Sequence, residues 1–270
     1  MTVSVSPPAA ALPMYDWPEI RTATDALWTA IADALCRAGL DAPDALDRAR
    51  EPMQVWRDPQ LLLAQTCGLP LSRHLMDQVA VVGVPAYRLP GVVPGNYCSR
   101  IVARRDDARA RLGAFRGAVA AVNMPVSQSG LAALACAVAP LRHATPFFAA
   151  VQWTGAHRAS VRAVAQGDAD VAAIDAVSWE LALRHEPAAL ALRVIASTPQ
   201  TPGLPLITAR RDACGTLAAA VSDAIDSLSA DSRSALLLEG FCAVPASVYA
   251  DFDRRCLAAL RAGNTGLDIA

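Results

Sequence analysis

Hydrophobic and polar positions along this chain alternate between short apolar runs and segments with helical spacing. The runs that predict strands lie at residues 9–12, 61–64, 79–84, 96–104, 119–122, 147–153, 170–174, 192–196 and 206–209. Helical spacing predicts helices at residues 24–37, 69–76, 131–138 and 159–166, and two or three more after residue 210. Strands that alternate with helices in this way predict an α/β fold with parallel strands.

Two connecting segments favour two lobes over a single sheet. Residues 97–104 are extended, and residues 198–205 are rich in proline. The segment between them has the pattern of a complete α/β unit, so we expect two lobes with a central ligand cleft, joined by two crossover strands that act as a hinge. The predicted lobes are residues 1–100 with 205–270, and residues 101–204.

Composition and charge exclude several classes of function. The 270 residues include 24 basic and 25 acidic side chains, for a formal net charge of -1. A charge so close to zero gives no electrostatic attraction for nucleic acid, which we do not expect as a partner. Every basic residue is arginine. Without lysine, the chain cannot form a Schiff base or supply the lysine of a nucleotide phosphate-binding loop.

The cysteines and histidines do not predict a metal site, and no cofactor is indicated. None of the 7 cysteines falls in a C-x-x-C pair, and none of the 4 histidines has a partner at i, i+4. No apolar run approaches the roughly 18 residues of a membrane-spanning helix. Residues 1–12 contain no arginine and only a short apolar stretch, so they do not form a recognisable signal peptide.

Polar side chains follow three predicted strands directly, in the position where open α/β sheets bind ligands. The first of these loops is Ser127-Gln128-Ser129-Gly130. Two hydroxyls and the N–H groups of a helix start suit a tetrahedral oxyanion, and Gly130 would let that anion approach the backbone closely. The alternative is that the serines only cap a helix.

The other two loops contain His157 and Asp175. His157 follows Gly155 at a helix start and would donate to the same anion, also as imidazolium, or else be structural. Asp175 ends an apolar strand. Its carboxylate would accept a proton from a P–OH group or meet a cationic substituent, or else cap the next helix. No G-x-S-x-G pattern surrounds Ser127, so a Ser-His-Asp triad is not predicted.

These loops, taken in order, resemble the phosphate, phosphite and phosphonate substrate-binding proteins of ABC transporters, which have the type II periplasmic-binding-protein fold. The resemblance covers about residues 12–208. It rests on the Ser-x-Ser-Gly pattern within residues 123–130, on residues 154–172, and on the Pro202-Gly203-Leu204-Pro205 return. Gln128 departs from the family, which often has a small hydroxyl residue at that position.

The resemblance implies a set of ligand-binding residues. From the second lobe, Ser127, Gln128, Ser129 and His157 would hold the phosphorus oxyanion. Asp175 and Tyr97 would face the ligand pocket. The first lobe would contribute Tyr15, Gln65 and Thr66.

The function implied by the resemblance is non-enzymatic. The protein would be a monomer in the periplasm that binds a phosphonate, phosphite or phosphate and presents it to an ABC permease. Two alternatives use the same fold in the cytoplasm. One is an enzyme of cofactor biosynthesis with His157 and Asp175 as acid and base, and the other is a ligand sensor.

Overall fold

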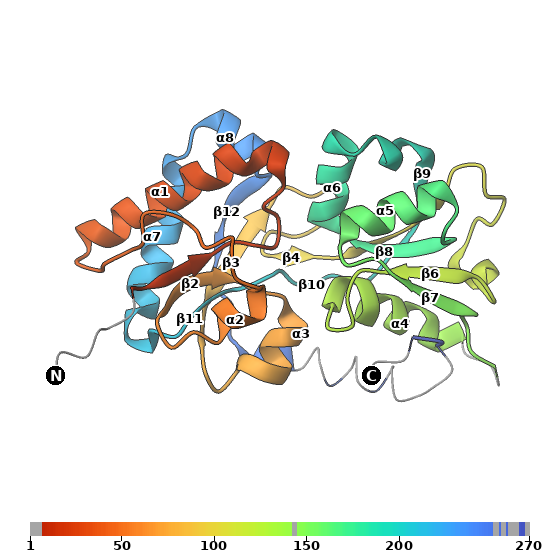
Figure 1. Ribbon diagram of the computed structural model, residues 1–270, viewed down its shortest axis with the longest axis horizontal. Helices are drawn as coiled ribbons and strands as arrows, with labels where there is room; N and C mark the ends of the chain where they lie inside the picture. Colours follow the sequence, from red (N-terminus) through yellow and green to blue (C-terminus); the bar gives the residue numbers. More distant parts are fainter. Residues whose placement is uncertain (1–6, 142–144, 251–253, 255–257, 259–264, 268–270) are drawn as a thin grey trace. The chain divides into compact units, whose positions relative to one another are not determined.

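The computed structural model describes residues 7–141, 145–250, 254, 258 and 265–267, whose secondary structure is drawn in Figure 1. These residues form two compact units. Unit 1 lies within Met1–Asn96 and Pro202–Tyr249, and unit 2 lies within Tyr97–Thr201 and Ala250–Ala270. The chain enters unit 2 at β4 (Asn96–Tyr97) and returns at β10 (Thr201–Pro202), and these two short strands pair with each other.

Unit 1 contains a mixed five-stranded sheet with the strand order β1-β2-β11-β3-β12. β1 is parallel to β2, whereas β11 is antiparallel to both β2 and β3, and β12 is antiparallel to β3. The strands are β1 (Ala9–Ala11), β2 (Leu61–Gln65), β3 (Ala80–Tyr87), β11 (Leu206–Thr208) and β12 (Leu238–Cys242). The helices are α1 (Arg21–Arg37), α2 (Pro52–Trp56), α3 (Gly68–Pro70) continued by η2 (Leu71–Leu75), α7 (Cys214–Ser227) and α8 (Ala230–Ala235).

The longest helix of unit 1, α1, follows the sequence pattern closely. Trp28, Ile31 and Leu35 are buried and recur every three or four residues, so they share one face of the helix. α1 packs along α7, which in turn packs on β3 and β12. The chain leaves α1 through Gly39, whose φ of +80° favours glycine. Within the described part of the chain, no helix is both long and apolar enough to cross a membrane.

Unit 2 contains a second five-stranded sheet with the order β7-β6-β8-β5-β9. β6 is parallel to β7 and β8, and β5 is antiparallel to β8 and β9. In Figure 1, α5 and α6 lie on one face of this sheet and α4 lies on the other. The strands are β5 (Ser99–Arg104), β6 (Val119–Val122), β7 (Ala150–Trp153), β8 (Val171–Asp175) and β9 (Leu192–Ser197). The helices near the sheet are η4 (Gln128–Ala132) continued by α4 (Ala133–Val138), α5 (His157–Gln166) and α6 (Ala176–His185).

The structure confirms the α/β class and differs from the sequence prediction in three respects. Both sheets are mixed, because β5, β11 and β12 run antiparallel to their neighbours. After residue 210 there is a strand, β12, as well as helices. Residues 265–267, expected in the first lobe, group instead with unit 2, where Leu267 is part of the core and the Thr265 carbonyl accepts a hydrogen bond from the Phe148 N–H at 3.1 Å.

Candidate functional site

Three neighbouring strands of unit 2 end at one edge of its sheet. Because β6 is parallel to β7 and β8, the loops after Val122, Trp153 and Asp175 begin at the same edge. β5 runs in the opposite direction and starts there, with Ser99 paired to Asp175. The three polar loops predicted from the sequence are therefore gathered at this edge.

Ser127 caps the helix that starts at η4. Its Oγ accepts a hydrogen bond from the Gly130 N–H at 2.9 Å, so the capping role that the sequence left open is realised here. Because Ser127 Oγ acts as the acceptor in this bond, its hydroxyl hydrogen can still be donated. Ser129 Oγ lies 3.5 Å away.

Ser129 and His157 connect the loops after β6 and β7. Ser129 Oγ lies 2.7 Å from His157 Nε2. The Ser129 carbonyl accepts a hydrogen bond from Ser99 Oγ at 2.8 Å, so its backbone is held from β5 as well. Ser99 and Ser129 are both buried. These contacts fix the Ser129 hydroxyl at the start of a helix, where the first N–H groups have no partner within the helix.

The His157 ring is neutral near neutral pH. Burial lowers its pKa from 6.5 to about 4, so the imidazolium donor that the sequence allowed is not present. Nδ1 is buried and has no hydrogen-bond partner among the described residues. The adjacent Arg158 is occupied by its own partners, since its Nε donates to Glu186 Oε2 at 2.8 Å and its Nη2 to the His185 carbonyl at 2.9 Å.

Gly130 faces protein atoms rather than open space. A Cβ added at this position would collide with Asn123 Oδ1 and lie 2.9 Å from Asn123 Cγ. The sequence suggests that Gly130 leaves room for an anion, but the structure gives that room to the Asn123 side chain. Asn123 was not selected from the sequence.

Asp175 is buried at the end of β8 and caps α6. Its Oδ1 accepts hydrogen bonds from the N–H groups of Val177 at 2.8 Å and Ser178 at 3.1 Å. The N-cap alternative is therefore realised at Asp175. Because Asp175 pairs with Ser99 across β8 and β5, its carboxylate lies at the same edge of the sheet as Ser129 and His157.

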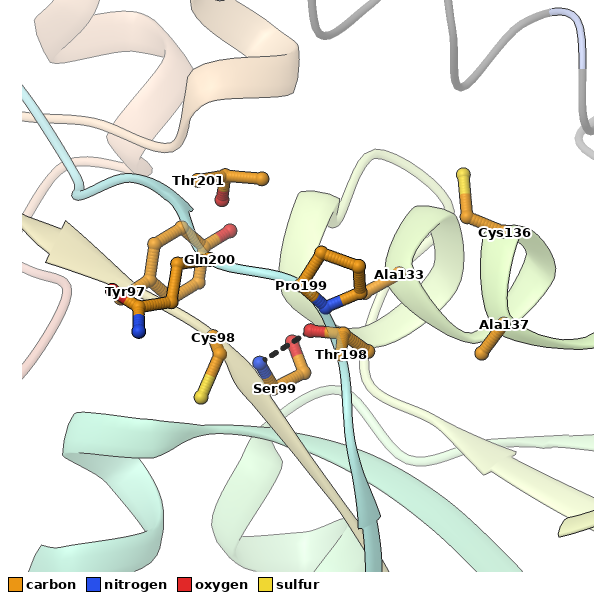
Figure 2. Close-up of a pocket in the computed structure, with 10 residues that line it drawn as sticks. All are labelled: Tyr97, Cys98, Ser99, Ala133, Cys136, Ala137, Thr198, Pro199, Gln200 and Thr201. Carbon is orange, nitrogen blue, oxygen red and sulfur yellow. Dashed lines mark hydrogen bonds between the residues drawn. The ribbon is translucent and has the colours of Figure 1, made fainter. Parts of the chain in front are cut away.

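Tyr97 lines a second pocket in unit 2, and Gln128 contacts one of the other residues that line it. Figure 2 shows this pocket, of about 230 Å³, with Tyr97 and Thr201 on one side and α4 on the other. Gln128 is buried, and its Nε2 donates to Thr201 Oγ1 at 3.4 Å. The lining residues are Tyr97, Cys98, Ser99, Ala133, Cys136, Ala137, Thr198, Pro199, Gln200 and Thr201. Of the predicted ligand residues, only Tyr97 lines this pocket.

The three predicted residues of unit 1 are partly brought together. Tyr15 and Gln65 line a small pocket of about 30 Å³ with Tyr87, which stacks edge-on against Tyr15 at a centroid distance of 5.1 Å. Gln65 Nε2 donates to Tyr87 Oη at 3.1 Å and to the Leu204 carbonyl at 3.3 Å. Thr66 is buried and is not among the lining residues of that pocket.

Thr66 is held mainly by backbone contacts. Its N–H donates to the Pro205 carbonyl at 2.9 Å and its Oγ1 to the Cys67 carbonyl at 3.4 Å. No metal site accompanies either group of residues in the described part of the chain, where no three His, Cys, Asp or Glu side chains come close enough to share an ion.

Three residues that sequence reasoning missed contribute to these arrangements. Ser99 and Asn123 contact the Ser129–His157 pair in unit 2, and Tyr87 contacts Gln65 in unit 1. Asn123 does have a signal in the sequence, because it is the first polar residue after the apolar run 119–122. Ser99 and Tyr87 become evident only once the strand pairing is known.

Comparison with known proteins establishes the family. A family model described as "ABC transporter, phosphonate, periplasmic substrate-binding protein" matches residues 78–250, which is more than half of the chain. The chain belongs to this family. Its description is of a transport protein that binds a substrate and not of an enzyme. A search of curated proteins gave no match by sequence.

Solved structures with the same fold include other members of this class of binding proteins. PhnD1 from Prochlorococcus marinus, solved with methylphosphonate, is 13% identical with a TM-score of 0.71, over 93% of this chain and 97% of that one. A binding protein component of an ABC phosphonate transporter from Pseudomonas aeruginosa is 17% identical with a TM-score of 0.69, over 95% and 87%. XAC2383 from Xanthomonas citri, solved with chloride, is 15% identical with a TM-score of 0.67, over 96% and 99%. The fold is therefore the type II periplasmic-binding-protein fold.

Proposed function

We propose that this chain binds a small phosphorus oxyanion, namely a phosphonate, phosphite or phosphate, at the edge of the unit 2 sheet where β6, β7 and β8 end. The observation that carries the proposal is the 2.7 Å contact between Ser129 Oγ and His157 Nε2. This contact brings the N-terminus of η4 next to the N-terminus of α5. Helix N-termini offer N–H groups and partial positive charge, which favours anions. The family to which the chain belongs supports the same ligand class.

The proposed site binds its anion through neutral groups. Ser127 and Ser129 supply hydroxyls, and His157 is uncharged because burial lowers its pKa. With the ring proton on Nε2, that N–H donates to Ser129 Oγ and the Ser129 hydroxyl hydrogen is left for the anion. Arg158, the cation next in sequence to His157, is paired with Glu186. Neutral hydrogen-bond donors do not neutralise the charge of the oxyanion that they bind. Because their directions are fixed, they also determine which of its oxygens can carry a proton.

Asp175 would then act as the selectivity residue. A buried carboxylate close to an unprotonated anion is unfavourable, but it accepts a hydrogen bond from a P–OH group or an amino substituent. Sulfate offers neither group near neutral pH. The proposal therefore expects discrimination against sulfate. Tyr15, Gln65, Thr66, Tyr97 and Gln128 remain predicted ligand contacts.

A ligand screen by thermal unfolding tests the proposal. Methylphosphonate, phosphite, phosphate and sulfate are each added to the purified chain, and saturation at 100 times Kd should stabilise it by about 2.7 kcal/mol. At least one phosphorus oxyanion should raise the melting temperature, and sulfate should not. If none of the three phosphorus compounds does so, the ligand assignment is wrong.

Delivery to a permease is the second part of the proposal. The chain would act as a periplasmic monomer, with its ligand released unchanged to an ABC permease, in line with the family description. Phosphorus NMR of the released ligand should show no product, whereas a new signal would favour the enzyme alternative. With the transporter reconstituted in liposomes, ATP hydrolysis should rise only when this protein and its ligand are both present.

A further inference from the structure

The side chain of Asn123 lies between the two loops that carry Ser129 and His157. Its Nδ2 is 3.4 Å from His157 Nε2, the same nitrogen that Ser129 Oγ approaches at 2.7 Å. The Asn123 backbone reaches the same loop, since its carbonyl accepts a hydrogen bond from the Gly155 N–H at 2.8 Å. Asn123 thus contacts the loop after β7 through both its main chain and its side chain.

The other end of the Asn123 amide is unusual. Its Oδ1 is buried and has no hydrogen-bond partner among the described residues. A buried polar atom without a partner costs stability, so its presence calls for a physical explanation. The atom lies against Gly130, where a Cβ would collide with it.

Gly130 is needed here for space and not for backbone conformation. Its φ is not among the positive values found at other glycines of the chain, so alanine could adopt the same backbone. What alanine could not do is share the volume that Asn123 Oδ1 and Cγ already occupy. Gly130 and Asn123 therefore form a matched pair.

We infer that Asn123 is a positioning residue of the oxyanion site, which holds the His157 ring against Ser129 and is itself seated on Gly130. The inference rests on the proposed function for its effect on ligand affinity. The packing between Asn123 and Gly130, and the contact to His157, belong to the ligand-free protein and can be measured without any ligand.

A double-mutant cycle on the ligand-free protein tests the packing. Gly130→Ala should lower the melting temperature, because the new methyl group displaces the Asn123 amide. In the Asn123→Ala/Gly130→Ala protein the methyl group enters vacated space, so adding Gly130→Ala should cost much less. Gly215→Ala is the matched control, because a Cβ there meets nothing within 4 Å. An equal cost of Gly130→Ala with and without Asn123 would overturn the inference.

The nitrogen chemical shifts of the His157 ring test the positioning itself. Asn123→Ala removes the amide beside Nε2, so both ring shifts should change, whereas Gly215→Ala should leave them as in the parent. A residue that only supported the loop would leave the ring's surroundings, and hence these shifts, unchanged. Unchanged shifts in a folded Asn123→Ala protein would therefore contradict a positioning role.

Titration with methylphosphonate connects the positioning to binding. Asn123→Ala should weaken affinity by about tenfold, as expected when a hydrogen bond to a charged ligand is poorly aligned. Gly130→Ala should weaken it similarly, and the double variant should be no weaker than either single one. Parent affinity in both single variants would refute the inference. If methylphosphonate, phosphite and phosphate all fail to bind the parent, the proposed function fails, while the cycle and the ring shifts still decide the positioning role.

Discussion

The candidate site residues of unit 1 and of unit 2 differ in how their polar atoms are used. In unit 1, Gln65 Nε2 donates to two protein acceptors, Tyr87 Oη and the Leu204 carbonyl. The Thr66 N–H donates to the Pro205 carbonyl. In unit 2, Asn123 Oδ1 and His157 Nδ1 are buried without a partner among the described residues. The Gln65 amide and the Thr66 N–H in unit 1 are paired within the protein, whereas two polar atoms at the unit 2 site have no hydrogen-bond partner among the described residues.

This difference indicates where the binding energy for an anion should come from. A donor already bonded to the protein must exchange one partner for another, and the net gain is small. A buried acceptor without a partner, such as Asn123 Oδ1, has already lost its hydration, so a ligand that brings a P–OH hydrogen to it gains the full interaction, whereas an unprotonated anion does not. The residues at the edge of the unit 2 sheet should therefore control affinity more strongly than those of unit 1.

The largest effect on affinity is expected at Ser129. Ser129→Ala removes a hydroxyl donor to a charged ligand, a loss of about 1.5–3 kcal/mol, or roughly 10- to 150-fold in Kd. Isothermal titration with the best phosphorus oxyanion from the screen measures it. The control is Ser227→Ala in unit 1, whose Oγ donates to the Ala224 carbonyl and which should bind as the parent does. A Ser129→Ala protein with parent affinity would return this loop to a purely structural role.

Ser127 provides a contrast within the same loop. Because its Oγ caps the helix, Ser127→Ala should lower the free energy of unfolding by about 1 kcal/mol, in addition to any loss of affinity. Ser129 makes no capping bond, but Ser129→Ala removes the 2.7 Å contact to His157 Nε2, so it should lower both stability and affinity. Denaturant unfolding measures the stability of both variants. Titration separates the two roles, because Ser129→Ala should lose more affinity than Ser127→Ala, and an equal or larger loss for Ser127→Ala would contradict the assignment.

A change in selectivity is expected at Asp175. Asp175→Asn keeps an oxygen for the Val177 and Ser178 N–H groups, and asparagine is as good an N-cap as aspartate. It removes the charge, however, and supplies a donor. The ratio of phosphate to sulfate affinity should fall by about tenfold. Asp168→Asn, at an exposed position of the same unit, is the control. An unchanged ratio in Asp175→Asn would place selectivity elsewhere.

The sequence predicts the strands that carry the site better than it predicts their direction and pairing. The strands at residues 61–64, 119–122 and 170–174 were predictable because a continuous apolar run of that length must be covered on both faces. The direction of the strands was not predictable from the sequence. β5 and β11 come directly after the segments that connect the two units, and no local sequence pattern shows which way a strand runs after such a connection. β12 was missed because its pairing with β3 joins residues about 150 positions apart.

The same reasoning explains the outcome at the site. Ser127, Ser129 and His157 were selected because small donors at predicted helix starts suit an anion, and the structure brings Ser129 and His157 together. The role of Asn123 depends on Gly130 and on a loop about 30 residues away, so its position after a strand carried no specific meaning. The neutral state of His157 depends on burial, which the sequence does not reveal.

Acid should affect the folded state through His157. Its pKa is lowered to about 4 from 6.5, so between these values the unfolded chain takes up the proton first and stability falls as the pH falls. Above about 6.5 this contribution is constant. Carboxylates such as Asp107, whose pKa the Arg109 guanidinium lowers to about 2, lose their contribution only at lower pH.

Thermal unfolding of the parent and of His157→Gln between about pH 6.5 and 5 isolates the contribution of His157, because the two proteins differ only in this ring. His157→Gln should flatten the curve in this range, whereas His74→Gln, at an exposed position in unit 1, should not. If the parent is equally stable across the range, the ring is not buried in its neutral form.

The smallest change in affinity is expected at Gln65. Gln65→Ala leaves the buried Leu204 carbonyl and Tyr87 Oη without the amide donor, so it should lower the free energy of unfolding by about 1–3 kcal/mol. Because the amide is already used within unit 1, the loss of affinity for the phosphorus oxyanion should stay within about threefold. Titration and denaturant unfolding of this one variant measure both quantities. The reverse result, with stability kept and affinity lost, would mean that Gln65 changes partners when the ligand binds. In that case the internally paired groups of unit 1 would be as much a part of the site as Ser129.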